Sequence, residues 1–131
     1  MKTFKATGGS VKLTKNNKSI EFLFEVIRRE EDWEKKLVER MRLYNDFYDN
    51  FLPGDSGFSS MPQLIFNCED DKHMVETFKE IVKSQIEIPH IKLYFTTDLR
   101  QNDENLAESL IEFKLIDGKY KIENLELKIL G

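Results

Sequence analysis

The stretch SIEFLFEVIR, residues 19–28, followed directly by REEDW at residues 29–33, decides the fold of this chain. Residues 20–27 alternate in the period of two that is typical of a strand. One face of this strand carries Ile20, Phe22, Phe24 and Val26. The other face carries Glu21, Leu23, Glu25 and Ile27. The strand leads into a segment with a different period, which predicts a change from strand to helix.

That segment has apolar residues at three- and four-residue steps, which places them on one stripe of a helix. They are Trp33, Leu37, Met41, Tyr44, Tyr48 and Phe51. The opposite face is charged and includes Arg40, and the stripe is expected to be the core face of the helix. Acidic residues 30–32 favour the positive end of the helix dipole. Pro53-Gly54 is expected to end the helix.

On either side of this pair of elements, the pattern predicts further strands and helices. Residues 10–14 alternate as a half-buried strand, and the turn at 15–18 joins them to the next strand as a hairpin. Residues 63–67 read as a buried strand, a helix begins at Asp70 or Asp71 and continues to Val82, and residues 91–95 read as a strand. Strand, helix and strand over about 30 residues form a βαβ unit with parallel strands.

The last third predicts a helical turn at 105–108 and a hairpin of strands 110–115 and 120–130 around Asp117-Gly118. The fold class is therefore α/β, with a mixed sheet of about five to six strands and two main helices. It includes one βαβ unit and a C-terminal β-hairpin. Residues 1–131 are expected to form a single domain.

Composition narrows the function classes. The net charge of −4 argues against a free-standing nucleic-acid binder, because phosphate contacts require a basic surface. No apolar run approaches a membrane span, no secretory signal is visible, and the single cysteine, Cys68, cannot form an internal disulfide. A cytoplasmic location is expected from these features.

Several short sequence segments resemble those of a known protein family. They are Thr7-Gly8-Gly9, residues 11–13 and 22–26, the helix with Lys36-Leu37 and Tyr44, and residues 62–70 and 93–100. This order resembles the nuclease-like domain of the replication-relaxation family, found on plasmids and conjugative elements of Gram-positive bacteria. The resemblance implies a restriction-endonuclease-like fold related to the PD-(D/E)XK group. It also implies an N-terminal winged helix that binds DNA, for which this chain has no room.

In such nucleases, the resemblance implies, an acid after the first turn and acids on the second strand hold Mg²⁺ beside a basic residue. Glu25 stands at the second-strand position, but Ile27 replaces the next acid and Gly8 or Gly9 replaces the turn acid. No lysine follows Glu25 at the expected place, although Arg28 is near. Because Mg²⁺ needs two or more oxygen ligands, the nuclease site is expected to be inactive and to hold no metal.

Other candidate site residues fall on the strands or directly after them. Glu25, with Glu21 on the same strand face, is either a functional acid or half of an exposed pair near a sheet edge. Asp70 and Asp98 follow strands expected to be parallel, where ligand sites are common, and Thr97 and Arg100 lie beside Asp98. The alternative is that Asp70 caps a helix and Asp98 lies in a turn.

Three remaining features have simple interpretations. The two histidines, His73 and His90, lack zinc-ligand spacing, and Cys68 is expected to be a small core residue. Phe47 and Phe58 can leave an exposed apolar patch, which would suggest self-association as a homodimer or a partner domain.

Three functional hypotheses follow, and their balance leans away from an enzyme. The first is a catalytically degenerate nuclease-fold domain of a plasmid-replication or conjugation protein, binding a protein partner, or DNA through another domain. The second is a small acidic α/β binding protein, such as a toxin-neutralising immunity protein, suited to a basic target. The third is an active Mg²⁺-dependent nuclease using Glu25 with Asp70 or Asp98. No cofactor is expected unless the third holds.

Overall fold

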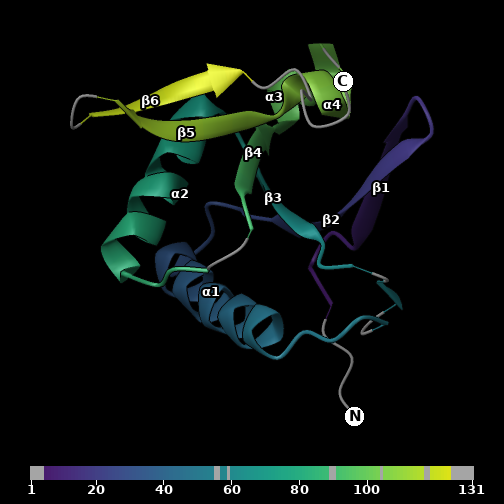
Figure 1. Cartoon of the computed structure of the whole chain (residues 1–131). Coiled ribbons are helices and arrows are strands. Elements are labelled where there is room, and N and C mark those ends of the chain that lie inside the picture. The colour runs from purple at the N-terminus through teal and green to yellow at the C-terminus, as the bar shows by residue number, and fades with distance from the viewer. Residues whose placement is uncertain are drawn as a thin grey trace.

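In the part of the chain that the structure describes, six strands form one mixed sheet whose spatial order is the order along the chain (Figure 1). The computed structural model describes residues 5–54, 57–58, 60–88, 91–103, 105–116 and 119–124. The strands are β1 (Ser10–Lys15), β2 (Lys18–Val26), β3 (Gln63–Cys68), β4 (Leu93–Thr97), β5 (Ile111–Ile116) and β6 (Lys119–Asn124). The helices of the described residues are α1 (Trp33–Asp49), α2 (Asp71–Ser84), α3 (Asp98–Asp103) and α4 (Leu106–Ser109).

The central strands β2, β3 and β4 are parallel, and the outer pairs β1–β2, β4–β5 and β5–β6 are antiparallel. Two long helices make the parallel connections, α1 from β2 to β3 and α2 from β3 to β4. The α/β class, the mixed sheet and the two main helices predicted from the sequence are confirmed. The parallel pairing of β3 with β4 is confirmed as well.

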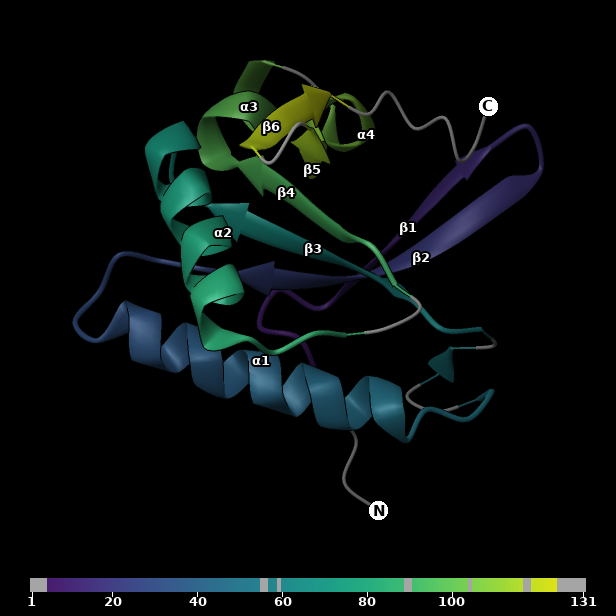
Figure 2. The same ribbon diagram turned by 60° about the vertical axis from the view of Figure 1, so that its left-hand side comes forward.

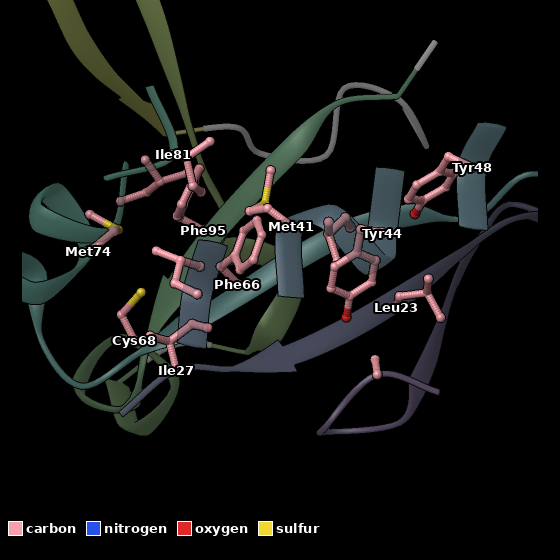
Figure 3. Packing of buried hydrophobic residues seen from close by; sticks show 14 of the residues in the cluster. Leu23, Ile27, Met41, Tyr44, Tyr48, Phe66, Cys68, Met74, Ile81 and Phe95 are labelled. Atoms are coloured by element: carbon pink, nitrogen blue, oxygen red, sulfur yellow. The ribbon is translucent and has the colours of Figure 1, made fainter. Parts of the chain in front are cut away.

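Both long helices pack on the same face of the sheet (Figure 2). The two crossovers run in the same direction along the sheet, from β2 to β3 and from β3 to β4. Because both crossover connections have the same handedness, their helices lie on the same face of the sheet. This helix face holds the larger core cluster, in which Leu23, Phe66 and Phe95 from three strands meet Met41 and Met74 from the two helices (Figure 3).

The opposite face of the sheet carries a second cluster built around Phe22, Ile65, Tyr94 and Leu110. Phe22 and Tyr94 meet edge to face, with ring centroids 5.8 Å apart. The predicted alternation of residues 20–27 is therefore confirmed, because Phe22 and Leu23 belong to different clusters on opposite faces.

The β1–β2 hairpin extends away from the helices (Figures 1 and 2). Its two-residue turn places both Asn16 and Asn17 at positive φ, as a tight hairpin requires. Before β1, the N–H of Gly8 donates to Phe24 O at 2.7 Å, and Gly9 O accepts from Phe24 N at 2.9 Å. Two residues thus face one, as in a β-bulge. A Cβ at Gly8 would lie 2.7 Å from Phe24 O, so this close approach requires glycine.

Several element boundaries differ from the prediction. The helix α1 ends at Asp49, so Phe51 lies beyond it, and β4 begins at Leu93 and continues to Thr97. The helix α3 was not expected. It forms because the Thr97 hydroxyl accepts from Arg100 N at 3.1 Å, a capping bond at the helix start. The turn at Asp117-Gly118 and the end of the predicted last strand, residues 125–130, lie outside the described residues.

The described part of the chain contains no helix that is both long enough and apolar enough to span a bilayer. The apolar patch expected at Phe47 and Phe58 does not form as predicted. Phe58 is buried in the main core cluster, and Phe47 is half-buried against Tyr48 and Phe51.

Candidate functional site

Glu25, the candidate acid on the second strand, is buried on the helix face of β2 and has a side chain only 1% exposed. Its Oε1 accepts from Arg40 Nη2 at 2.8 Å, from Thr7 N at 3.3 Å and from the hydroxyl of Tyr44. Its Oε2 accepts from Thr7 Oγ1 at 2.8 Å and from Arg40 Nε at 3.2 Å. Both oxygens of this carboxylate are therefore occupied by donors of the protein itself.

The two strongest partners of Glu25 come from α1. Arg40 makes a two-point contact, the arrangement that binds a carboxylate most strongly, and its guanidinium lies 5.3 Å from the centre of the Tyr44 ring. Burial, and then the charge of Glu25, raises the pKa of Tyr44 well above its usual range, so the phenol stays protonated and donates. The network is consequently stable as an ion pair with a neutral tyrosine.

The same carboxylate fixes the segment before β1. The Thr7 hydroxyl donates to Glu25 Oε2 and accepts from Val26 N at 2.8 Å, while Arg40 Nη2 also donates to Lys5 O at 3.0 Å. The interpretation of Glu25 as an exposed acid paired with Glu21 is wrong. Glu21 is half-exposed opposite Lys12 of β1, and Glu25 is buried because α1 covers this half of β2.

The ends of the three parallel strands meet at one edge of the sheet, which was expected for β3 and β4 only. Here Asp98 Oδ1 accepts from Asn67 Nδ2 at 3.0 Å and from Arg28 Nη2 at 3.3 Å. The Oδ1 of Asn67 accepts in turn from Gln101 Nε2 at 2.6 Å. Asp98, which begins α3, therefore contacts Arg28, which follows β2, and Asn67, which lies near the end of β3.

Asp70 caps α2, as one interpretation of the sequence predicted, because its Oδ1 accepts from His73 N at 2.8 Å. This bond, followed by the bonds from Arg29, lowers the pKa of Asp70. Arg29 binds both Asp70 and Glu76, and its backbone N–H donates to Glu69 Oε2 at 2.8 Å. The connection after β2 is thereby fastened to the start of α2.

Arg100 and Thr97 are also occupied. Arg100 binds both oxygens of Asp71, at 2.8 and 3.1 Å, and so joins α3 to α2. Thr97 is fully buried and uses its hydroxyl to cap α3. Three arginines, Arg28, Arg29 and Arg100, therefore connect neighbouring elements along this edge.

The strand order does not provide the usual condition for a ligand crevice at these strand ends. In open α/β sheets, ligands bind where the connections leave to opposite faces, so that two loops separate. Here the strand order never reverses, and both crossover helices lie on the same face. The physical condition for such a crevice is therefore not met between β2, β3 and β4.

The candidate acids do not form a common site. Glu25 is bound by Thr7, Arg40 and Tyr44, whereas Asp70 and Asp98 are bound at the strand ends by Arg29 and Arg28. In the portion of the chain that is described, no three His, Cys, Asp or Glu side chains are grouped to hold a metal ion.

Sequence patterns did not reveal the partners of these acids. Arg40 was placed on the charged face of α1, but its side chain is only 23% exposed and turns toward Glu25. The one available signal is its position four residues before Tyr44, at the border of the apolar stripe. Arg29, Asn67, Asp71 and Gln101 carried no local signal, because their partners lie 29 to 47 residues away.

Cys68 is buried in the core, as predicted, and burial raises the pKa of its thiol to about 12. The thiol contacts Thr77 Oγ1 at 3.5 Å. A thiol with so high a pKa is not ionised near neutral pH, so Cys68 is no nucleophile in this structure.

Comparison with models of known protein families, with curated proteins and with solved structures gave no match.

Proposed function

We propose that this chain is a catalytically inactive domain that acts by binding another protein. One observation carries the proposal. Glu25, the only acid at a nuclease position, has both oxygens bound by Thr7, Arg40 and Tyr44. A catalytic Mg²⁺ needs free oxygen ligands on more than one carboxylate. Using Glu25 as a ligand would require breaking a buried ion pair.

The resemblance to the nuclease-like domain of replication-relaxation proteins remains part of this proposal. On that hypothesis, a restriction-endonuclease-like domain of a plasmid or conjugation protein lost its metal site, and the remaining acid became a structural ion pair. The burial of Glu25 against Arg40 supports such a change of role. Contact with DNA would then come from another domain, as the resemblance implies.

The charge of the strand-end edge indicates the chemistry of the partner. We define the acidic edge as residues 28–32, 69–72 and 98–100. It holds seven acidic residues against four basic ones. Three of the four basic residues, Arg28, Arg29 and Arg100, are already bound to aspartates of the same edge. The surplus negative charge repels nucleic acid and attracts a basic protein surface.

The segments of the acidic edge are also held in place before a partner binds. The arginine pairs connect the segment after β2 with α2 and α3, so these parts lose little further freedom when a partner binds. Leu99 lies among these charges with 61% of its surface exposed, which provides an apolar contact at a polar surface. A basic target favours the small acidic binding protein, including the immunity-protein alternative, over direct DNA binding.

Binding of decalysine peptide tests the acidic edge. The Glu30→Lys/Glu31→Lys variant is expected to bind about ten-fold more weakly than the parent, which corresponds to ~1.4 kcal/mol. Both residues are exposed, so the fold should be unaffected. The affinities are measured by calorimetry at about 0.15 M salt, where screening acts over roughly 8 Å.

The matched control is Asp46→Lys/Asp49→Lys, which changes the net charge equally at the other end of α1, about 20 Å along the helix. This control should bind decalysine within about two-fold of the parent, because it lies beyond the screening length. Equal weakening in both variants would show that net charge alone, and not the acidic edge, governs binding.

A further inference from the structure

His73 occupies an unusual place in the first turn of α2. Its side chain is 0% exposed and lies against Trp33, the first residue of α1. The two rings meet edge to face, with centroids 4.8 Å apart and an interplanar angle of 82°. The imidazole Nδ1 accepts from the backbone N–H of Glu69 at 3.1 Å. His73 thus contacts both the β3–α2 connection and the start of α1.

These contacts define the protonation state of the ring. A backbone N–H can only donate, so Nδ1 carries no proton and the neutral ring has its hydrogen on Nε2. Nε2 is buried and has no hydrogen-bond partner in the part of the chain that the structure describes. An added proton must therefore go to Nδ1, where it replaces the lone pair that holds the Glu69 N–H.

The surroundings of the ring divide into two groups. Burial, and then the charge of Arg29, lower the pKa of His73. The negative charges of Glu69, Glu76 and Asp70 raise it, and the net shift is downward. The nearest carboxylate oxygen, Glu69 Oε2, is 3.8 Å from Nδ1. The positive end of the α2 dipole also disfavours a cation in the first turn. The neutral ring is therefore the state that fits the folded protein.

We propose that the contact of His73 with Trp33 and Glu69 is a pH-sensitive joint, in which a proton on Nδ1 breaks the Glu69 bond and separates the two rings. The imidazolium then leaves the buried position and loosens the β3–α2 connection from the start of α1. Glu69 and Asp70 both hold Arg29, so the change reaches the acidic edge. The joint stands on this geometry and does not depend on the proposed function.

The direction of the pH effect follows from the lowered pKa. Below the ordinary histidine value of about 6.5, the unfolded chain binds a proton that the folded state does not. Stability is therefore complete above this pH and decreases as the pH falls. The joint opens when the pH reaches the lower pKa of the folded state.

Trp33 is the only tryptophan of the chain, so its fluorescence reports on the joint directly. Acidification should change Trp33 emission with a midpoint below pH 6.5, while far-UV circular dichroism stays unchanged. His73→Gln should remove this transition. His90→Gln, which changes the only other histidine, should retain it. Persistence of the transition in His73→Gln, or its coincidence with loss of circular dichroism, would overturn the proposal.

A second measurement does not depend on the folding of a variant. Nitrogen NMR of the two imidazoles in the unmodified protein distinguishes the ring tautomers. At neutral pH, His73 should carry its proton on Nε2, with Nδ1 as acceptor. A proton on Nδ1, or a His73 that titrates at or above the ordinary histidine pKa, would contradict the joint.

Discussion

At the scale of single residues, Glu25 shows how a long-range ion pair changes the role of an acid. Removing two charges from water is costly, and the cost is offset only when hydrogen bonds satisfy both groups. Arg40, Tyr44 and Thr7 supply those bonds and come from α1 and from the segment before β1. The carboxylate therefore holds three parts of the chain together, which explains its burial without any catalytic role.

Glu25→Gln tests this structural role. The change keeps the shape of the side chain but removes the charge of Glu25 from its ion pair with Arg40, so the free energy of unfolding should fall by about 2 kcal/mol. The full penalty for a broken buried pair is reduced here because Arg40 is 23% exposed and can be hydrated. Urea denaturation followed by circular dichroism measures the loss.

Glu21→Gln is the matched control, since it changes the same residue type on the same strand at a half-exposed position. It should lower the free energy of unfolding by less than about 0.5 kcal/mol. The double variant Glu25→Gln/Arg40→Gln should show coupling of about 1 kcal/mol or more. Equal losses from Glu21→Gln and Glu25→Gln would contradict a structural role for the ion pair.

At the scale of elements, the starts of the helices organise the strand-end edge. Acidic residues gather there because helix N-termini have unpaired N–H groups and a partial positive charge. Asp70 caps α2, and Arg100 binds Asp71 in the first turn of the same helix. The carboxylates that suggested a metal site are thus used to begin helices and to bind arginines.

Asp70→Ala should lower the free energy of unfolding by about 1 kcal/mol, because it leaves the N–H of His73 without its cap. Asp70→Asn retains an acceptor oxygen and loses only the charge, so it should stay within about 0.5 kcal/mol of the parent. Thermal denaturation of the two variants separates the contribution of the cap to stability from that of the charge. Equal losses in Asp70→Asn and Asp70→Ala would show that the charge paired with Arg29, which both variants lack, matters more than the cap.

At the scale of the whole molecule, one sheet contributes side chains to both core clusters, one on each of its faces. Phe95 of β4 contacts Phe66, Phe78 and Phe113, and so links the strands to α2 and to the β5–β6 hairpin. With both long helices on one face, the strand ends carry the acidic residues of the connections that lead into α1 and α2. The net charge of −4 has the same sign as this edge, which favours a basic protein over nucleic acid as partner.

The protein is expected not to cleave plasmid DNA in the presence of Mg²⁺ or Mn²⁺, since Glu25 is occupied and Asp70 and Asp98 are bound by arginines. Agarose gel electrophoresis after incubation at micromolar protein measures cleavage. The Glu25→Gln variant, checked for folding by circular dichroism, serves as the comparison. Cleavage by the parent that is lost in folded Glu25→Gln would instead support the active-nuclease hypothesis.

Local patterns were sufficient for most of the fold. The change from period two to helical spacing at Trp33 predicted β2 and α1, and the apolar runs at 63–67 and 91–95 predicted the parallel strands. These signals are local, because alternation and helical spacing reflect which face of an element is buried. The helix α3 was missed because its cap, Thr97, belongs to the preceding strand.

The sequence by itself determined the α/β class, the order of the main elements and the two faces of β2, because each depends on neighbouring residues. Only the tertiary structure decided the role of Glu25, since its partners Thr7, Arg40 and Tyr44 are 15 to 19 residues away and meet it through packing. A glutamate on an alternating strand has the same local pattern whether it faces water or an arginine. Which of these it faces depends on the position of α1 over the sheet.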